Sequence, residues 1–581
     1  MEVNTRIAVP SRKITLGIAI LITLALVWSR FVDLGKFPPG LSNDETEYVV
    51  SGKSYSLHGR DVSGYGLPLS LIKSETDGVI SPIPAIMSAP FLTGRQLNLA
   101  TARWPYATAN IITAVGIFFI IYLLTKNTRA GWVGMIWFLV NPWSVYMAHN
   151  TADAPMALMF YVWGVVLYLK NSGAGLIPAM ILFTAGFFSY HGAKPQLLPL
   201  VLVISFYRYK WAINKLSLKQ AGLMIVFAAS LTAMFVLAAK KIPGAIILGG
   251  ENTTAVQVEQ IKFAVNESRR KSIEAWFSPV FVNKYTETIK VLTEKYLNTF
   301  SLNTLFLSGD ERATYHFGRQ GLFYLFDTVL ILIGAVTLFR KKPQAAGLLL
   351  LIIFIAPVST VISSVETSVI NRSFMLLPSL IIFAGYGLYF LAKSYTKAII
   401  VILIATISVL NFWQWWRYQN PVQGANNYWL AERVAAKYMQ LEDPRIKIIY
   451  VTNEPWNELV RQIFYAGYQD QIYYLKKTYP YSRSGPFDYK NITMTNVCPS
   501  DYNPKVVYVV KRGMNNCFEK KGAGYTITDM RDAGDVFRIF NGTLCDGKST
   551  DVWRRFNLES DFEIDNMDTE QFCRRWINLA K

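Results

Sequence analysis

Acidic side chains gather near the N-terminus, where Asp44, Glu45 and Glu47 fall within one helical turn. Two prolines and a glycine come just before them, and Ser42 or Asn43 can cap a helix whose first turn carries these carboxylates. The helix dipole by itself favours acidic residues in a first turn, so capping is the plain structural interpretation. The chemical interpretation is that Asp44 or Glu45 is catalytic, as a general base that takes a proton from a hydroxyl group.

Other ionisable side chains stand at the ends of apolar segments. At a membrane boundary such groups are costly, so they are usually paired, snorkelling to the interface, or functional. The candidates for binding a donor phosphate or another part of a substrate are Arg103, His149, Asp153, His191, Lys194, His316, Arg319 and Arg372, with Lys73 in the first long loop. Carboxylates facing cations suit a reaction in which a base deprotonates an acceptor hydroxyl while cations stabilise a departing phosphate.

The composition indicates a membrane protein that positions these groups. Of the 581 residues, 52% are hydrophobic and 14% aromatic, and the mean hydropathy is +0.25. The formal charge is +19, yet residues 417–581 hold 23 basic and 20 acidic residues, so 16 of the excess charges lie in the first 416 residues, between apolar runs. The charge therefore follows the membrane, and nucleic acid is not expected as a partner.

Hydropathy and charge together predict a polytopic α-helical protein with about eleven transmembrane helices. The apolar segments lie at roughly 14–32, 103–124, 131–147, 154–170, 176–190, 195–208, 220–239, 321–339, 346–364, 372–392 and 397–416. With the N-terminus in the cytoplasm and the first segment as an uncleaved signal anchor, every inner loop is basic. We therefore expect an integral plasma membrane protein with a transmembrane domain over 1–416, long outer loops at 33–102 and 240–320, and an extracytoplasmic domain over 417–581.

The extracytoplasmic region shows the pattern of a small α/β domain. A helix is predicted over 427–441 and another near 456–467, with strands at 445–452 and in the runs IYYL, KVVYVV and VFRIF. All four cysteines of the chain fall here, where disulfides can form. Two disulfides are expected among Cys498, Cys517, Cys545 and Cys573, and three pairings are open. Free or metal-binding thiols are the alternative, although the spacing C-x-x-C is absent.

Five short motifs in order resemble the GT-C membrane glycosyltransferases, in particular the family 39-like branch with protein O-mannosyltransferases and lipid A aminoarabinose transferases. The motifs are NDETEY (43–48), LNLATARWPYA (97–107), NPWSVYMAHNTADAPMAL (141–158), FSYHGAKPQLLPL (188–200) and NRSFMLLPSLIIFAGYGL (371–388). The resemblance covers about 70% of the chain, from residue 14 to about residue 416, and rests on the order and spacing of the motifs.

The resemblance implies transfer of a sugar from a polyprenyl-phosphate donor to a lipid, glycan or protein acceptor at the outer face of the membrane. It makes Asp44 the general base and Glu45 a second carboxylate that positions the base or the acceptor, with Arg103 and Lys194 facing the donor phosphate. The chain departs from the family pattern at two places. Ile80 stands where the branch often has a lysine, and His149 stands where it often has an arginine, so Lys73, His149 or Arg319 would have to replace the missing cations.

Two other functions fit the same composition. An oligosaccharyltransferase-like enzyme is one. Such enzymes usually carry a WWDYG-type motif, and the most similar stretch of this sequence, WQWWRYQN (413–420), lacks the aspartate. A non-enzymatic lipid or sugar transporter is the other, but no internal repeat is visible and the charges lie at segment ends. We expect no obligatory cofactor, while a divalent cation could bind the acidic pair.

Overall fold

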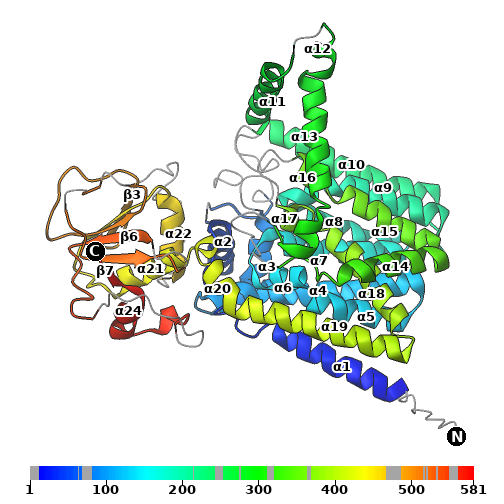
Figure 1. Ribbon diagram of the computed structural model, residues 1–581, viewed down its shortest axis with the longest axis horizontal. Coiled ribbons are helices and arrows are strands. Elements are labelled where there is room, and N and C mark those ends of the chain that lie inside the picture. Colours follow the sequence, from blue (N-terminus) through cyan, green and yellow to red (C-terminus); the bar gives the residue numbers. More distant parts are fainter. Residues whose placement is uncertain are drawn as a thin grey trace.

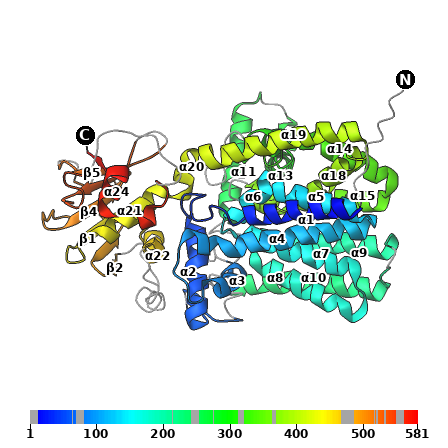
Figure 2. The same ribbon diagram turned by 90° about the horizontal axis from the view of Figure 1, so that it is seen from below.

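The computed structural model describes residues 12–62, 64–68, 81–212, 215–241, 253–273, 276–310, 320–362, 368–465, 486–514, 517–518, 521–530, 534–548 and 561–580. Its main body is a bundle of helices that run in nearly the same direction, and a sheet domain stands beyond one end of the bundle (Figures 1 and 2). The helix α2 (Asn43–His58) lies between the two parts, close to the short helix α3 (Pro82–Leu92). The acidic stretch therefore sits where the bundle meets the sheet domain.

The bundle consists of apolar helices of different lengths. They are α1 (Arg12–Ser29), α4 (Leu99–Thr125), α5 (Thr128–Val140), α6 (Pro142–His149), α7 (Asp153–Lys170), α8 (Ile177–Ser189), α9 (Lys194–Lys210), α10 (Leu218–Lys241), α14 (Asp327–Lys341), α15 (Pro343–Ile355), α16 (Val358–Ile362), α18 (Leu376–Leu391) and α19 (Tyr395–Gln414). Within the described ranges, four helices are long and apolar enough to cross a membrane, or five if α6 and α7 count as one bent span. Each of the eleven predicted segments contains a helix, which agrees with a helical membrane protein, while the number of about eleven spans stays a prediction.

The bundle helices are interrupted around residues 141 and 150. The predicted segment 131–147 is two helices, because Asn141 caps α6 with its side chain and Pro142 starts it. After His149 the chain leaves the helical conformation for three residues, and α7 then starts at Asp153. The axes of α6 and α7 differ by 115°. This bend leaves backbone N–H groups without partners inside a helix and places them, with the Asp153 carboxylate, at the end of the bundle nearest the sheet domain.

Glycines allow two bundle helices to touch closely. A side chain at Gly334 of α14 would run into the backbone carbonyl of Phe383 on α18, and one at Gly387 of α18 would run into the carbonyl of Leu330. Small residues at such a crossing let helix backbones approach within membranes. The two helices can therefore pack along their length around a continuous apolar core.

The sheet domain follows α19 through a π-helical turn (Trp415–Gln419), α20 (Asn420–Gln423) and a 3-10 turn (Asn426–Tyr428). It contains α21 (Leu430–Leu441), α22 (Pro455–Tyr465), α24 (Thr569–Trp576) and the strands β1 (Ile448–Val451), β2 (Phe487–Tyr489), β3 (Ile492–Thr495), β4 (Val507–Lys511), β5 (Tyr525–Thr528), β6 (Asp535–Phe540) and β7 (Asn578–Leu579). The strand order is β2-β3-β1-β4-β6-β5-β7, and β1 is parallel to both β3 and β4.

The sequence prediction for this domain is confirmed at α21, β1, α22, β4 and β6, whereas the run IYYL lies outside the described residues. The two expected disulfides are present, and their pairing is Cys498–Cys517 and Cys545–Cys573. The first closes the segments on either side of β4, and the second ties the segment after β6 to α24. Short strands and small helices expose much surface, so these cross-links stabilise the domain by restricting its unfolded chain.

Candidate active site

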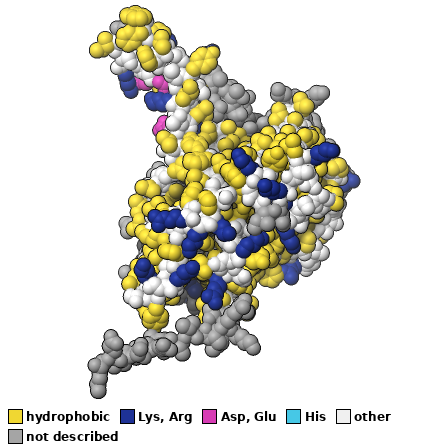
Figure 3. All heavy atoms as spheres, turned by 90° about the vertical axis from the view of Figure 1, so that its right-hand side faces the viewer, with side chains coloured by type: hydrophobic (Ala, Val, Ile, Leu, Met, Phe, Trp, Pro, Cys, Tyr) yellow, Lys and Arg dark blue, Asp and Glu magenta, His cyan; other side chains and the backbone are white. Residues whose placement is uncertain are grey.

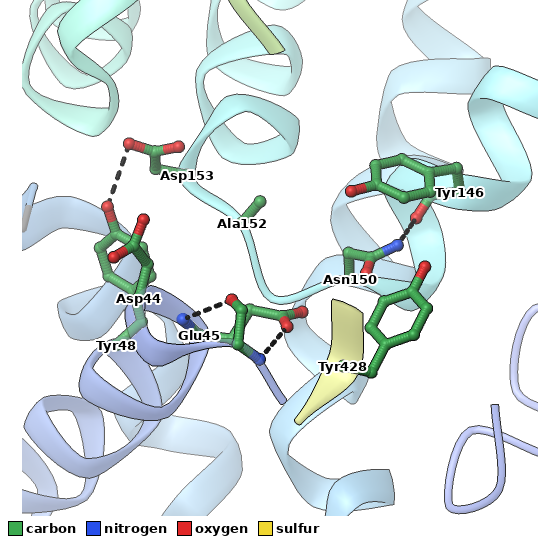
Figure 4. Close-up of a pocket in the computed structure, with 9 residues that line it drawn as sticks. Asp44, Glu45, Tyr48, Tyr146, Asn150, Ala152, Asp153 and Tyr428 are labelled. Atoms are coloured by element: carbon green, nitrogen blue, oxygen red, sulfur yellow. Dashed lines mark hydrogen bonds between the residues drawn. The ribbon is translucent and has the colours of Figure 1, made fainter. Parts of the chain in front are cut away.

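An acidic pocket opens where α2, the α6–α7 bend and the first turn of the sheet domain meet. It is lined by Ser42, Asp44, Glu45, Tyr48, Tyr146, Asn150, Ala152, Asp153 and Tyr428. Figure 4 shows Asp44, Tyr48 and Asp153 on one side of the pocket, with Tyr146 and Tyr428 on the other. The three carboxylates are thus Asp44 and Glu45 from the predicted first turn and Asp153 from a different helix.

Glu45 is a buried carboxylate that connects two segments of the pocket wall through hydrogen bonds. Its Oε2 accepts a hydrogen bond from the backbone N–H of Ser42 at 2.7 Å, which completes the capping box at the start of α2. Its Oε1 accepts one from the N–H of Thr151 at 2.7 Å, across the pocket, within the α6–α7 bend. The side chain is only 4% exposed. Glu45 therefore joins two segments that are far apart in the chain, and its oxygens are already engaged.

Asp44 and Asp153 have contrasting surroundings. Asp44 is exposed at the pocket, one residue before the buried Glu45. Asp153 is buried and accepts a hydrogen bond at 3.0 Å from the hydroxyl of Tyr48. Burial, and then the negative charges of Asp153 and Asp44, raise the pKa of Tyr48 well above its usual value. Tyr48 thus stays protonated and donates to Asp153, which leaves Asp44 as the carboxylate most accessible to a substrate.

Two predicted cations lie close to the pocket in different ways. Arg103 is fully buried and donates from Nη1 to the carbonyl of Leu34 at 2.8 Å and from Nη2 to that of Gly40 at 2.6 Å. It holds the backbone that leads into α2. Lys194, 5% exposed, has its Nζ 3.2 Å from Nδ1 of His191 and interacts electrostatically with Asp153. The positive charge of Lys194 therefore acts on the buried Asp153 carboxylate.

The other predicted residues are dispersed. His149 is buried with its ring against Trp416, and it lines a second hollow together with the ion pair between Asp33 and Arg417. Arg372 is half-buried, and its backbone carbonyl accepts a hydrogen bond from Gln196. Lys73, Ile80, His316 and Arg319 lie outside the described residues. Of the predicted residues, the structure thus brings Asp44, Glu45 and Asp153 together in one pocket and places His149 at another. His191 and Lys194 do not line the pocket, and Lys194 is linked to it through its electrostatic interaction with Asp153.

The sheet domain holds the segment that carries the carboxylates. Trp456 of α22 donates from Nε1 to Glu47 at 3.0 Å, and Asn43 donates to Glu454 at 3.0 Å. On the preceding loop, Arg433 of α21 donates to the carbonyl of Pro39 at 2.6 Å. Apolar residues of α2 share a buried cluster with α21, α22 and the sheet. The first turn of α2 is thus set by the sheet domain as well as by the bundle.

A buried charge cluster reinforces this junction. Arg461 donates to Asn43 at the start of α2 and forms an ion pair with Glu458 at 2.6 Å, and Glu458 is buried with it. Lys511 pairs with Glu432 at 2.9 Å and lies 3.8 Å from Glu458. Burial, opposed by the charge of Arg461, raises the pKa of Glu458. Removing one member would leave a buried charge without its partner, so loss of any one of these side chains should destabilise the junction.

Several pocket residues were not among the sequence candidates. Tyr48 is one helical turn after Asp44, a spacing that places the two on the same face of α2 and could have identified it. Asn150 lies beside His149 in a quoted motif. Tyr428 belongs to a segment distant in sequence, and nothing in its neighbourhood points to the pocket. Burial, and then the charge of Glu45, raise the pKa of Tyr428 above its usual value, so it faces the pocket as a neutral hydroxyl.

The pocket carboxylates do not form a metal-binding cluster in the part of the chain that the structure describes. No group of three or more His, Cys, Asp or Glu side chains there could hold a metal ion. Both oxygens of Glu45 accept backbone N–H groups, and Asp153 accepts the Tyr48 hydroxyl. A divalent cation would have to displace these bonds, so the donor set fits a metal poorly.

No protein-family model matches this chain, and no curated protein does. Solved structures similar to it include ArnT from Cupriavidus metallidurans in the apo state, with 11% identity, a TM-score of 0.48 and coverage of 90% of this chain and 98% of that one. ArnT bound to undecaprenyl phosphate is 11% identical with a TM-score of 0.46, covering 91% and 98%.

The archaeal oligosaccharyltransferase AglB from Archaeoglobus fulgidus, in complex with an inhibitory peptide and a dolichol-phosphate, is 10% identical with a TM-score of 0.45, covering 90% of this chain and 74% of that one. These proteins are of the class that the ordered sequence motifs resemble. At such identities and TM-scores the likeness carries no argument about the chemistry of this chain, which therefore rests on its own residues.

Proposed function

We propose that this protein is a membrane glycosyltransferase that moves a sugar from a polyprenyl-phosphate-linked donor to an acceptor hydroxyl at the outer face of the membrane, with Asp44 as the general base. The observation that carries the proposal is the acidic pocket at the end of the apolar bundle. There the exposed carboxylate of Asp44 lies beside two buried carboxylates, those of Glu45 and Asp153.

The reaction requires one proton transfer and one substitution at carbon. Asp44 takes the proton of the acceptor hydroxyl as the acceptor oxygen forms a bond to the anomeric carbon of the sugar. The bond between that carbon and the phosphate oxygen breaks, and the polyprenyl phosphate leaves with the electron pair. Attack from the face opposite the phosphate inverts the configuration at the anomeric carbon.

The surroundings of Asp44 support its role. A general base must reach the solvent-facing substrate, and Asp44 is the exposed carboxylate of the pocket. Glu45 fixes its backbone by holding Ser42 on one side and Thr151 on the other. A base held in this way loses little freedom when it reaches the reactive geometry.

Among the described residues, the candidates for the cationic side of the proposed site are Lys194 with His191, and Arg103. Lys194 contacts His191 and interacts electrostatically with the buried Asp153, and we infer that this basic pair balances negative charge on the donor phosphate. Arg103 acts on the site through the loop that it holds. Its predicted contact with the donor phosphate would require a rearrangement of that loop.

The test is transfer by the full chain in lipid nanodiscs supplied with polyprenyl-phosphate-linked sugars. Asp44→Asn keeps the size of the side chain and removes the base, so we expect transfer to fall by about 10²–10⁴-fold. Asp443→Asn is the matched control, because Asp443 pairs with Arg445 on the surface of the sheet domain. Equal transfer by Asp44→Asn and by the parent would refute the proposed base.

A further inference from the structure

Helices that follow α10 in the sequence form an arm that leaves the body of the molecule. The arm consists of α11 (Thr253–Arg270), α12 (Ser278–Phe281) and α13 (Lys284–Asn298). It runs across the direction of the bundle helices, near the end that faces the sheet domain (Figure 1). Seen along the bundle, it extends beyond the outline of the body (Figure 3). An element that crosses the spans in this way is parallel to the plane of the membrane.

The arm is folded on itself, so its outward face is fixed. Ser268 of α11 donates to Glu287 of α13 at 3.3 Å, and the guanidinium of Arg269 donates to the carbonyl of Val282 at 3.0 and 3.2 Å. Val265 is buried between the helices. The side chains that remain exposed are therefore exposed after the arm has satisfied its own contacts.

Large apolar side chains cover the tip of the arm. Trp276 is 92% exposed and Ile273 is 95% exposed, and Phe277, Val280 and Phe281 beside them are exposed as well. Figure 3 shows the hydrophobic side chains gathered at this end, with charged ones nearer the body. Apolar patches of this kind mark a surface that meets another apolar phase. Trp in particular is enriched at membrane–water interfaces.

The apolar surface continues along α13. Tyr285, Ile289 and Leu292 follow one another at helical spacing and are all exposed. At the root of the arm, the hydroxyl of Tyr296 donates to the carbonyl of Phe354 at 3.0 Å. Phe354 belongs to the candidate span made by α15 and α16. The apolar stripe of α13 thus runs directly into a segment that is itself long and apolar enough to cross the membrane.

Basic side chains flank the tip in the manner of a membrane-surface helix. Arg269 and Arg270 end α11, Lys271 follows them, and Lys284 begins α13. Glu267 pairs with two of them, so the flank keeps a positive surplus. Cations beside an apolar face suit the phosphate groups of lipids.

We propose that the arm is an interfacial anchor, which lies in the lipid headgroup region on the side of the sheet domain with its aromatic tip inserted. The partner is a lipid surface. This inference does not depend on the reaction catalysed. Its structural consequence is that the arm, joined to α15 through Tyr296, sets the depth at which the neighbouring end of the bundle meets the membrane surface.

The test uses the full chain in phosphatidylcholine nanodiscs. The native cysteines are paired in disulfides, so a single cysteine in Trp276→Cys or Ile289→Cys can carry an environment-sensitive dye. Arg445→Cys, at an exposed position of the sheet domain, is the matched control. We expect brominated phosphatidylcholine to quench most of the emission at 276 and 289, with little quenching at 445. Aqueous iodide should quench in the opposite order.

Two results would overturn the anchor. Iodide could quench the dye at 276 as strongly as the dye at 445, which would place the tip in water. Alternatively, the dye at 276 could be shielded from both quenchers in nanodiscs that hold two copies of the chain, which would make the tip a contact between copies. Using two labelled positions separates an effect of the arm from local damage at either one.

Discussion

The neighbouring carboxylates Asp44 and Glu45 should respond in opposite ways to removal of their charge. Glu45 accepts two backbone N–H groups at 2.7 Å each and is 4% exposed. In Glu45→Gln the amide oxygen can keep only one of them, and the amide nitrogen faces the other donor. Loss of a charge-assisted bond, with a buried N–H left unsatisfied, should destabilise the junction by about 2–4 kcal/mol. Asp44 is exposed, so Asp44→Asn should cost less than about 1 kcal/mol through the helix dipole.

The assay pairs thermal unfolding with transfer in the same nanodisc preparation. Glu45→Gln should lower the apparent melting temperature clearly, whereas Asp44→Asn should melt like the parent and lose transfer. Glu45→Asp retains the charge but is one carbon shorter, so its melting temperature should lie between those of the parent and Glu45→Gln. The assignment of roles would be wrong if Asp44→Asn melted as early as Glu45→Gln, or if Glu45→Gln melted with the parent.

Three other substitutions test the elements around the site. Trp456→Phe removes the hydrogen bond to Glu47 and keeps an aromatic ring, so it should lower the stability of the junction by about 1–3 kcal/mol. Amide hydrogen exchange in the first turn of α2 should increase, and unchanged exchange would mean that the sheet domain does not hold this turn in place. Cys573→Ser opens a disulfide that closes a separation of 28 residues, and should lower sheet-domain stability by about 2–4 kcal/mol in urea unfolding, whereas an unshifted transition would contradict this. Gly387→Ala places a methyl group against the carbonyl of Leu330, so the α14–α18 contact should weaken by about 1–3 kcal/mol, seen as a lower melting temperature; a parent-like value would mean that these helices separate easily.

The sequence was most informative about local structure. Apolar segments of helical length, basic loops and the alternating pattern after residue 445 each depend on neighbouring residues, and a helix is found in every predicted apolar segment. The break at Asn141 and Pro142 was readable in principle, since proline favours a helix start. The existence of two disulfides was predictable from the location of the cysteines. Their pairing was open, because it depends on which segments the sheet brings within bonding distance.

The candidate site was predictable in part. The motif NDETEY indicated an acidic helix start, and the structure shows Ser42 as its cap. The motif around Asp153 indicated a second acidic position. Whether these positions meet depends on a contact across 105 residues, between Tyr48 and Asp153. Sequence spacing carries no information on such a contact. For the same reason the charge of Arg103 suggested a phosphate ligand, whereas its hydrogen bonds show a guanidinium that holds backbone.

By itself, the sequence determined that this chain is an apolar helical protein with a cysteine-bearing α/β domain, and that carboxylates start a helix after the first apolar segment. Those properties follow from hydropathy, periodicity and capping, which act between residues close in the chain. Only the tertiary structure decided that Glu45 is buried and bonded to two backbone N–H groups, whereas Asp44 is exposed. Neighbouring residues on a helix point in different directions, and what each side chain meets is set by segments that packing brings from elsewhere in the chain.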